Sequence, residues 1–268
     1  MSEQTPMQTL LIDAHVHIYP GYDWEKAVTN LLSNLPGAGS PDHPLIIGML
    51  AESKAHRFYK DVMEKPDSFT GRPIELTPGP DTGSIAIRVQ GLLKGYFMAG
   101  RQIVTREKLE ILALGVDVSV PDGLTANETL DSIRSASAIP VLSWSPGKWF
   151  GHRGKIIQTL ITTSTPDRFM IGDTAMRPGL WPLPCLMELA LKKGFQVIGG
   201  SDPLPLPGEE RRVGTYGIST LAAFDPNKPG SIIRQLLRQQ ENHFTLIGKR
   251  SALLPFLSRW VRNQLRNA

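Results

Sequence analysis

Short apolar runs bounded by Gly and Pro recur along most of the chain, and several of them alternate with longer segments of helical pattern. The runs have the length of ordinary strands, and the segments between them repeat apolar residues at helical spacing. The pattern predicts strands at 9–16, 44–50, 84–90, 116–120, 139–144, 168–173 and 195–201, with a weaker one at 101–105. It predicts helices at 24–35, 106–115, 126–136, 155–163 and 183–194.

Strands that alternate with helices are typical of parallel β-α-β units. Seven or eight such strands favour an α/β fold of the TIM-like (β/α) barrel type. A Rossmann-type sheet is less favoured, because no Gly-rich phosphate-binding motif follows the first strand. Residues 56–83 are rich in Pro and Gly and predict an insertion or a small hairpin. We therefore expect a barrel domain over residues 1–230.

The C-terminal part, residues 231–268, predicts two further helices packed on the barrel. The second of them carries an apolar stripe and, on another face, a row of arginines. The stripe consists of Leu254, Leu257, Val261 and Leu265, and the row of Arg259, Arg262 and Arg266. We expect the helix to pack on the barrel with its arginines in solvent. Binding of such a basic amphipathic helix to an anionic membrane, or to nucleic acid, is the alternative.

The composition is that of an ordinary globular protein of 268 residues, with a net charge of only +4. One cysteine excludes an internal disulfide and fits a reducing compartment. The N-terminus lacks the basic and apolar regions of a secretory signal, and no apolar run approaches the ~18 residues of a membrane span. These features predict a cytoplasmic protein without a transmembrane segment. No nucleic-acid partner is expected from so small a charge, and a homo-oligomer is left open.

Candidate chemistry begins in the stretch IDAHVHIY, residues 12–19. In a strand, Asp13, His15 and His17 point to one side, and the histidines lie at the C-terminal end. Barrels hold their reactive groups at that end of the strands. Asp202 directly follows the last predicted strand and would reach the same rim. Imidazole and carboxylate are zinc ligands, so the pattern predicts a divalent metal site, with manganese or iron as alternatives to zinc.

Three further side chains follow other predicted strands and are candidate ligands: Glu52, Asp173 and His152. A bound metal would make hydroxide available near neutral pH. Asp202 beside it could then act as general base. The sequence thus predicts Asp202 in both a catalytic and a ligand role.

The motifs DAHVH and GGSD, at the ends of the first and last predicted strands, resemble those of the amidohydrolase-like metallo-dependent hydrolases. More loosely, they are similar to the polymerase-and-histidinol-phosphatase family. The resemblance covers about residues 9–205. It implies that His15 and His17 bind metal, and that Asp202 binds metal and accepts a proton from water. Both families use more histidines than this chain offers, since none lies between His56 and His152.

Two loops concentrate positive charge: residues 143–155, with Lys148 and Arg153, and the loop after Asp202, with Arg211 and Arg212. Arginine suits bidentate contact with phosphate or carboxylate. We therefore expect a metal-dependent hydrolase that acts on a small anionic substrate. The alternative is a degenerate barrel without metal that serves as a ligand-binding or partner-binding protein, which the missing histidines favour.

Overall fold

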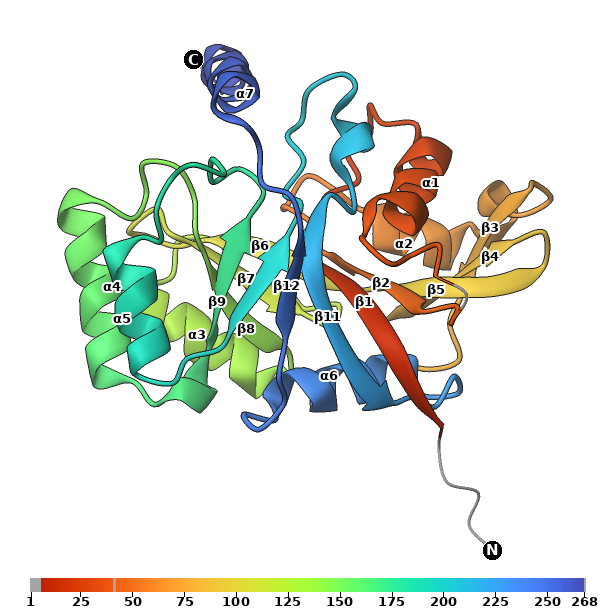
Figure 1. Ribbon diagram of the computed structural model, residues 1–268, viewed down its shortest axis with the longest axis horizontal. Helices are drawn as coiled ribbons and strands as arrows, with labels where there is room; N and C mark the ends of the chain where they lie inside the picture. The colour runs from red at the N-terminus through yellow and green to blue at the C-terminus, as the bar shows by residue number, and fades with distance from the viewer. Residues whose placement is uncertain (1–5, 41, 268) are drawn as a thin grey trace, which may run out of the picture.

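The computed structural model describes residues 6–40 and 42–267, whose strands form two mixed β-sheets with helices around them (Figure 1). One sheet has seven strands in the order β12-β11-β1-β2-β5-β4-β3, and the other has five in the order β10-β9-β8-β7-β6. The strands of the first are β1 (Met7–Val16), β2 (Leu45–Leu50), β3 (Ile74–Pro78), β4 (Ser84–Val89), β5 (Leu92–Met98), β11 (Tyr216–Ala223) and β12 (Thr245–Gly248). Those of the second are β6 (Gly100–Val104), β7 (Glu110–Leu114), β8 (Ile139–Ser143), β9 (Met170–Thr174) and β10 (Val197–Gly200).

The α-helices are α1 (Trp24–Asn34), α2 (Phe58–Glu64), α3 (Ala126–Ser135), α4 (Gly151–Thr163), α5 (Cys185–Lys192), α6 (Pro229–Arg238) and α7 (Leu253–Asn267). Short 3-10 helices lie at Pro66–Phe69, Pro166–Arg168 and Glu209–Arg212. At the start of α3, Thr125 and Glu128 form a complete capping box, which explains why this helix begins where its sequence pattern does.

The prediction of a TIM-like barrel is wrong, because the described strands form two separate mixed sheets rather than one closed parallel barrel. Among the described strands, parallel ladders are limited to β1–β2–β5 and β8–β9–β10. The segment 106–115, expected as a helix, instead contains β7, which pairs antiparallel with β6. Lys108, with a φ of +64°, turns the chain between these strands. All four residues Ile111–Leu114 are buried, so burial on both faces produced the apolar run that resembled a helix.

A shared core lies between the two sheets. It joins Ile12 and Ile47 of the first sheet to Leu112 and Val141 of the second, and Ile233 of α6 packs against it. Separate clusters cover the outer sides, with α1 and α2 on the first sheet and α3, α4 and α5 on the second. Two polar side chains, those of His15 and Asp202, lie outside these clusters, at the C-terminal ends of β1 and β10.

The two sheets meet at these strand ends. The Asp202 backbone N–H, just beyond β10, donates to the carbonyl oxygen of His15 in β1 at 2.9 Å. Gly200 makes this approach possible, because a Cβ at that residue would lie 2.3 Å from the Cβ of His15. On the other side, Glu52 after β2 forms an isolated parallel bridge with Arg101 of β6. Segments far apart in sequence are thus fixed side by side.

Helix α7 turns a different face to the molecule than its pattern suggested. Leu254 and Leu265 of the apolar stripe are 79% and 74% exposed, whereas Arg259 is 4% exposed. Arg259 donates to both carboxylate oxygens of Glu209, so the expectation that it lies in solvent is wrong. The side chain of Arg266 and residues 1–5 lie outside the described part, and the division at residue 230 stays a prediction. No helix in the described ranges is long and apolar enough to cross a membrane.

Candidate metal centre

Two imidazoles meet at the end of β1. The Nε2 atoms of His15 and His17 lie 3.0 Å apart, and both side chains are buried. The register between β1 and β2 shifts between Asp13 and Val16, so the strand does not simply alternate here. Asp13 lies where this shift begins, and its carboxylate accepts hydrogen bonds from the backbone N–H groups of Ser201 and Gly214, both at 2.8 Å. Asp13 therefore anchors neighbouring loops and does not join the histidine pair.

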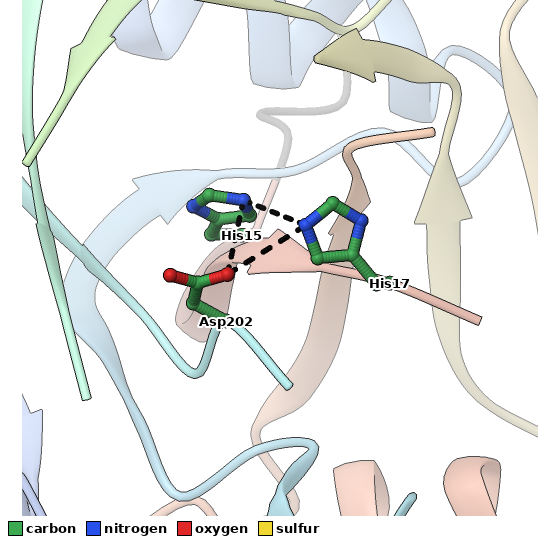
Figure 2. A group of neighbouring side chains, drawn as sticks. All are labelled: His15, His17 and Asp202. Carbon is green, nitrogen blue, oxygen red and sulfur yellow. Dashed lines mark hydrogen bonds and ion pairs between the residues drawn. The ribbon is translucent and has the colours of Figure 1, made fainter. Parts of the chain in front are cut away.

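Asp202 completes a triangle with the two histidines (Figure 2). Its Oδ1 atom lies 3.6 Å from the Nε2 atom of His15 and 3.6 Å from that of His17. The backbone at Asp202 is left-handed, with a φ of +48°, a conformation that is uncommon for residues other than glycine. The hydrogen bond to His15 O and the anchoring of Ser201 by Asp13 hold it there. Backbone contacts thus direct this carboxylate to the imidazoles.

The three side chains fit a small divalent cation. A tetrahedral zinc ion bound at about 2.0–2.1 Å would separate its ligand atoms by roughly 3.3 Å, close to the observed 3.0 and 3.6 Å. Each of the three side chains offers one ligand atom, and these atoms lie within 4.8 Å of one another. Among the side chains that the structure describes, this is the one group of three or more with such an arrangement. The group could therefore hold a metal ion.

The protonation of the group also suits metal binding. Burial and the neighbouring His15 hold the pKa of His17 well below its usual value, so its imidazole is neutral at pH 7. The Nδ1 atom of His17 is buried and has no hydrogen-bond partner among the described residues. Burial raises the pKa of Asp202, an effect that its interaction with His15 opposes. A neutral imidazole and a carboxylate without a fixed cation are the forms in which these groups bind metals.

The other three predicted ligands lie apart from this group. Glu52 accepts a hydrogen bond from the backbone N–H of Tyr59 at 3.2 Å, and burial raises its pKa to about 7. Asp173 is paired with the buried guanidinium of Arg177. His152 is exposed near the start of α4. The structure brings together three of the six predicted ligands, His15, His17 and Asp202. The metal-binding roles of all six residues stay predictions.

Two polar residues beside the group were missed in the sequence. Gln102 Oε1 lies 3.0 Å from His15 Nε2, and Gln102 Nε2 donates to Glu110 Oε1 at 3.5 Å. Glu110 forms an ion pair with Lys148. Gln102 stands in the weakly predicted strand, and Glu110 in the segment mistaken for a helix. If 106–115 is read as containing a strand paired with β6, the alternation of side chains places Gln102 and Glu110 on the same face of the sheet.

A cavity of about 360 Å³ opens beside the group. His17, Asp202, Glu110 and Lys148 line it, together with residues of the loop after Asp202 and of α7. Of the predicted anion-binding residues, Lys148 is part of this wall, whereas Arg153, Arg211 and Arg212 are not. Arg153 and Arg211 instead donate to the carbonyl oxygens of Gly147 and Gly208, within their own loops.

Comparison with solved structures finds chains of the same fold at low sequence identity. PsfC from Pseudomonas syringae PB-5123 matches with a TM-score of 0.58 and 15% identity, over 96% of this chain and 98% of that one. The lesion-specific endonuclease PfuEndoQ from Pyrococcus furiosus matches with a TM-score of 0.50 and 11% identity, over 89% of this chain. The chain spans 57% of the length of that endonuclease. No family model matches the sequence, and no curated protein matches it.

These likenesses show a shared fold and correct one expectation. The sequence led us to expect no nucleic-acid partner, yet an endonuclease is among the structural neighbours. The small net charge was a poor basis for that exclusion, because a local surface, not the total charge, contacts a nucleic acid. The expectation of no nucleic-acid partner therefore conflicts with these structural neighbours.

Proposed function

We propose that the protein is a metal-dependent hydrolase that acts on a small anionic substrate. The observation that carries the proposal is the convergence of His15 Nε2, His17 Nε2 and Asp202 Oδ1 at the wall of a cavity of ligand size. Distant structural likeness to an endonuclease is consistent with a loose relation to metal-dependent hydrolases. His15, His17 and Asp202 would hold the ion. When bound, a divalent metal supplies a water of lowered pKa and polarises the group under attack.

The chain's own residues would bind and orient the substrate and receive the proton. Asp202 is the carboxylate in the group and would accept a proton from the attacking water through an oxygen of its side chain. Lys148, 28% exposed in the cavity wall, would contact the anionic group of the substrate. The other ring nitrogen of His15, Nδ1, lies 3.5 Å from Ser143 Oγ, which would fix the orientation of that imidazole.

The charges of the cavity wall support an anionic substrate. Asp202 and Glu110 are acidic and Lys148 is basic, while His17 is neutral. The wall is therefore negative by itself, and a divalent cation would make it positive. An anion would then be attracted to the metal-loaded protein, and only to that form.

Elemental analysis tests the proposal. Purified protein, or protein reconstituted with zinc, manganese or iron, should hold about one equivalent of metal. The double variant His15→Ala/His17→Ala should hold almost none. His152→Ala is the matched control, because it removes an exposed histidine away from the group and should leave the metal content unchanged. Absence of metal from the reconstituted wild-type protein would overturn the proposal and favour a metal-free binding protein.

A second candidate is cleavage of a phosphodiester in nucleic acid, which the fold shared with a lesion-specific endonuclease supports. The two candidates are separated by substrate. The metal-loaded protein should be assayed on small phosphoesters, amides and lactones, and in parallel on duplex oligonucleotides with and without a lesion. Cleavage of the duplexes alone would select the second candidate.

A further inference from the structure

The cavity has a second wall, which the metal chemistry does not use. Trp260, Asn263 and Gln264 of α7 line it, far in sequence from the residues of the metal group. Leu204 and Met176 complete this side. None of these five side chains carries a charge, in contrast to the strand-end wall with Asp202, Glu110 and Lys148. One cavity thus combines a charged wall with a neutral one.

Asn263 carries the clearest sign of a missing partner. Its Oδ1 atom is buried and accepts no hydrogen bond from any residue in the described ranges. A buried acceptor without a donor is destabilising, and native structures rarely leave one unused. Asn263 also lines the cavity, so rotation of its amide would present this oxygen to a donor on a bound molecule.

The helix is held firmly enough to present these side chains in fixed positions. One turn before Asn263, Arg259 donates to Glu209 through Nε at 2.8 Å and through Nη2 at 2.6 Å. Its Nη1 atom donates to Ser251 Oγ at 2.8 Å. Phe256, one turn earlier again, packs in a cluster with Met176, Leu204 and Leu206. A bidentate, buried guanidinium pair has a defined geometry, so the neutral wall is pre-organised.

We infer that α7 is the recognition element for the part of the substrate that is not cleaved. The proposed occupant is an uncharged planar ring that packs on Trp260 and donates a hydrogen bond from N–H or O–H to Asn263 Oδ1. Its anionic group lies at the charged wall, beside Lys148. The inference rests on the proposed function for the anionic end and adds the chemistry of the other end. A substrate with charges at both ends would leave one of them unpaired against the neutral wall.

Binding of a graded ligand series to metal-loaded protein tests the inference. Inorganic phosphate, phenylphosphonate, and the 3- and 4-aminophenylphosphonates, whose C–P bond the proposed hydrolysis does not cleave, are titrated calorimetrically, with the corresponding benzoates as a carboxylate arm. The ring should increase affinity over phosphate, and the better-placed amino group should add about fivefold to tenfold. Trp260→Ala should remove the gain from the ring, and Asn263→Leu only the gain from the amino group. In each variant the affinity for inorganic phosphate should stay within about twofold of wild type.

Arg262→Ala is the matched control, because Arg262 is exposed on the same helix and does not line the cavity. It should leave every affinity unchanged. Equal affinity of the wild-type protein for inorganic phosphate and for all the ring compounds would overturn the inference, as would an amino-group gain that persists in Asn263→Leu. These outcomes are independent of the proposed function, whose failure shows as absent metal or absent phosphate binding in the wild-type protein.

Discussion

Asp173 and Asp202 lie at the C-terminal ends of two neighbouring parallel strands, yet their surroundings give them different contacts. In Asp173, which lies in β9, both carboxylate oxygens have hydrogen-bond donors within the protein. Arg177 donates to its two oxygens at 2.8 and 2.6 Å, and the Tyr216 hydroxyl donates to it at 2.8 Å. Asp202, beyond β10, has two imidazoles at 3.6 Å, and no guanidinium of the described side chains pairs with it.

The difference shows that a strand-end carboxylate becomes available for a metal only where no protein cation has taken its place. The guanidinium of Arg177 neutralises Asp173 in a buried setting, as a metal would neutralise Asp202. Asp173 therefore has its counter-ion within the protein, whereas the counter-ion of Asp202 could be a bound metal ion. Substitutions at the two aspartates should consequently affect different properties of the protein.

Asp202→Asn should produce the largest functional effect. Hydrolysis should fall by about 10²–10⁴-fold, because a proton acceptor and a metal ligand are lost together. Metal affinity should fall at least as much as the roughly 10–100-fold typical of changes to outer partners of a ligand. Since burial raises the pKa of Asp202, removing its charge should not lower the free energy of unfolding of the metal-free protein. Competition with a chelator and urea denaturation measure the two quantities, and a strongly destabilised variant would contradict the comparison.

Asp173→Asn should show the reverse pattern. It leaves the buried charge of Arg177 without its counter-ion, which should cost about 3–5 kcal/mol of the free energy of unfolding. The metal content of the folded protein should not change. Adding Arg177→Met should restore part of the stability, because it removes the unpaired charge. Urea denaturation with elemental analysis checks both points; loss of metal without loss of stability would show that Asp173 belongs to the metal centre.

Glu52→Gln sharpens the comparison with a third acid, which is half-buried and forms no ion pair with any of the described residues. Burial raises its pKa in the folded protein to about 7, above its ordinary value of 4.5. The folded state then binds more protons than the unfolded state between these values, so the wild-type protein loses stability as the pH rises through 7. Glutamine does not titrate, so the stability of the variant relative to wild type should increase by roughly 2–3 kcal/mol from pH 5 to pH 8. Urea denaturation at the two pH values measures this; a constant difference would show that Glu52 is ionised throughout.

The sequence was informative about the metal group because its members are local signals at strand ends. Two histidines one residue apart at the end of a strand, and an aspartate after GGS, could be recognised without knowing how the sheets are arranged. Asp173 gave a similar signal, but Arg177 follows four residues later and pairs with it. That spacing was visible in the sequence, and only the fold shows that the pair is buried.

Most individual strands and helices were predictable, whereas their assembly was not. The helices α1, α3, α4 and α5 and the strands β1, β2, β8 and β9 lie close to their predicted ranges. The barrel prediction was wrong because apolar runs do not reveal pairing direction. In the second sheet β7 is antiparallel to both of its neighbours, and in the first sheet β4 and β11 also pair antiparallel. For α7, amphipathicity indicated two faces but not which one packs. The buried contact of Arg259 with Glu209 is a tertiary interaction, and it placed the leucines outside.

Gly200 is the feature that fixes how far apart the ligands of the candidate centre lie. A methyl group there would lie 2.5 Å from the backbone nitrogen of His15, so β1 and β10 can approach this closely only because residue 200 has no side chain. The spacing between imidazoles and carboxylate is therefore set by a residue that is not itself a ligand. Ionic radius is matched by ligand spacing, and small ions such as zinc tolerate less expansion than manganese or calcium. A larger side chain at residue 200 would act as a wedge, so selectivity among metals could drift or be engineered while every ligand stays in place.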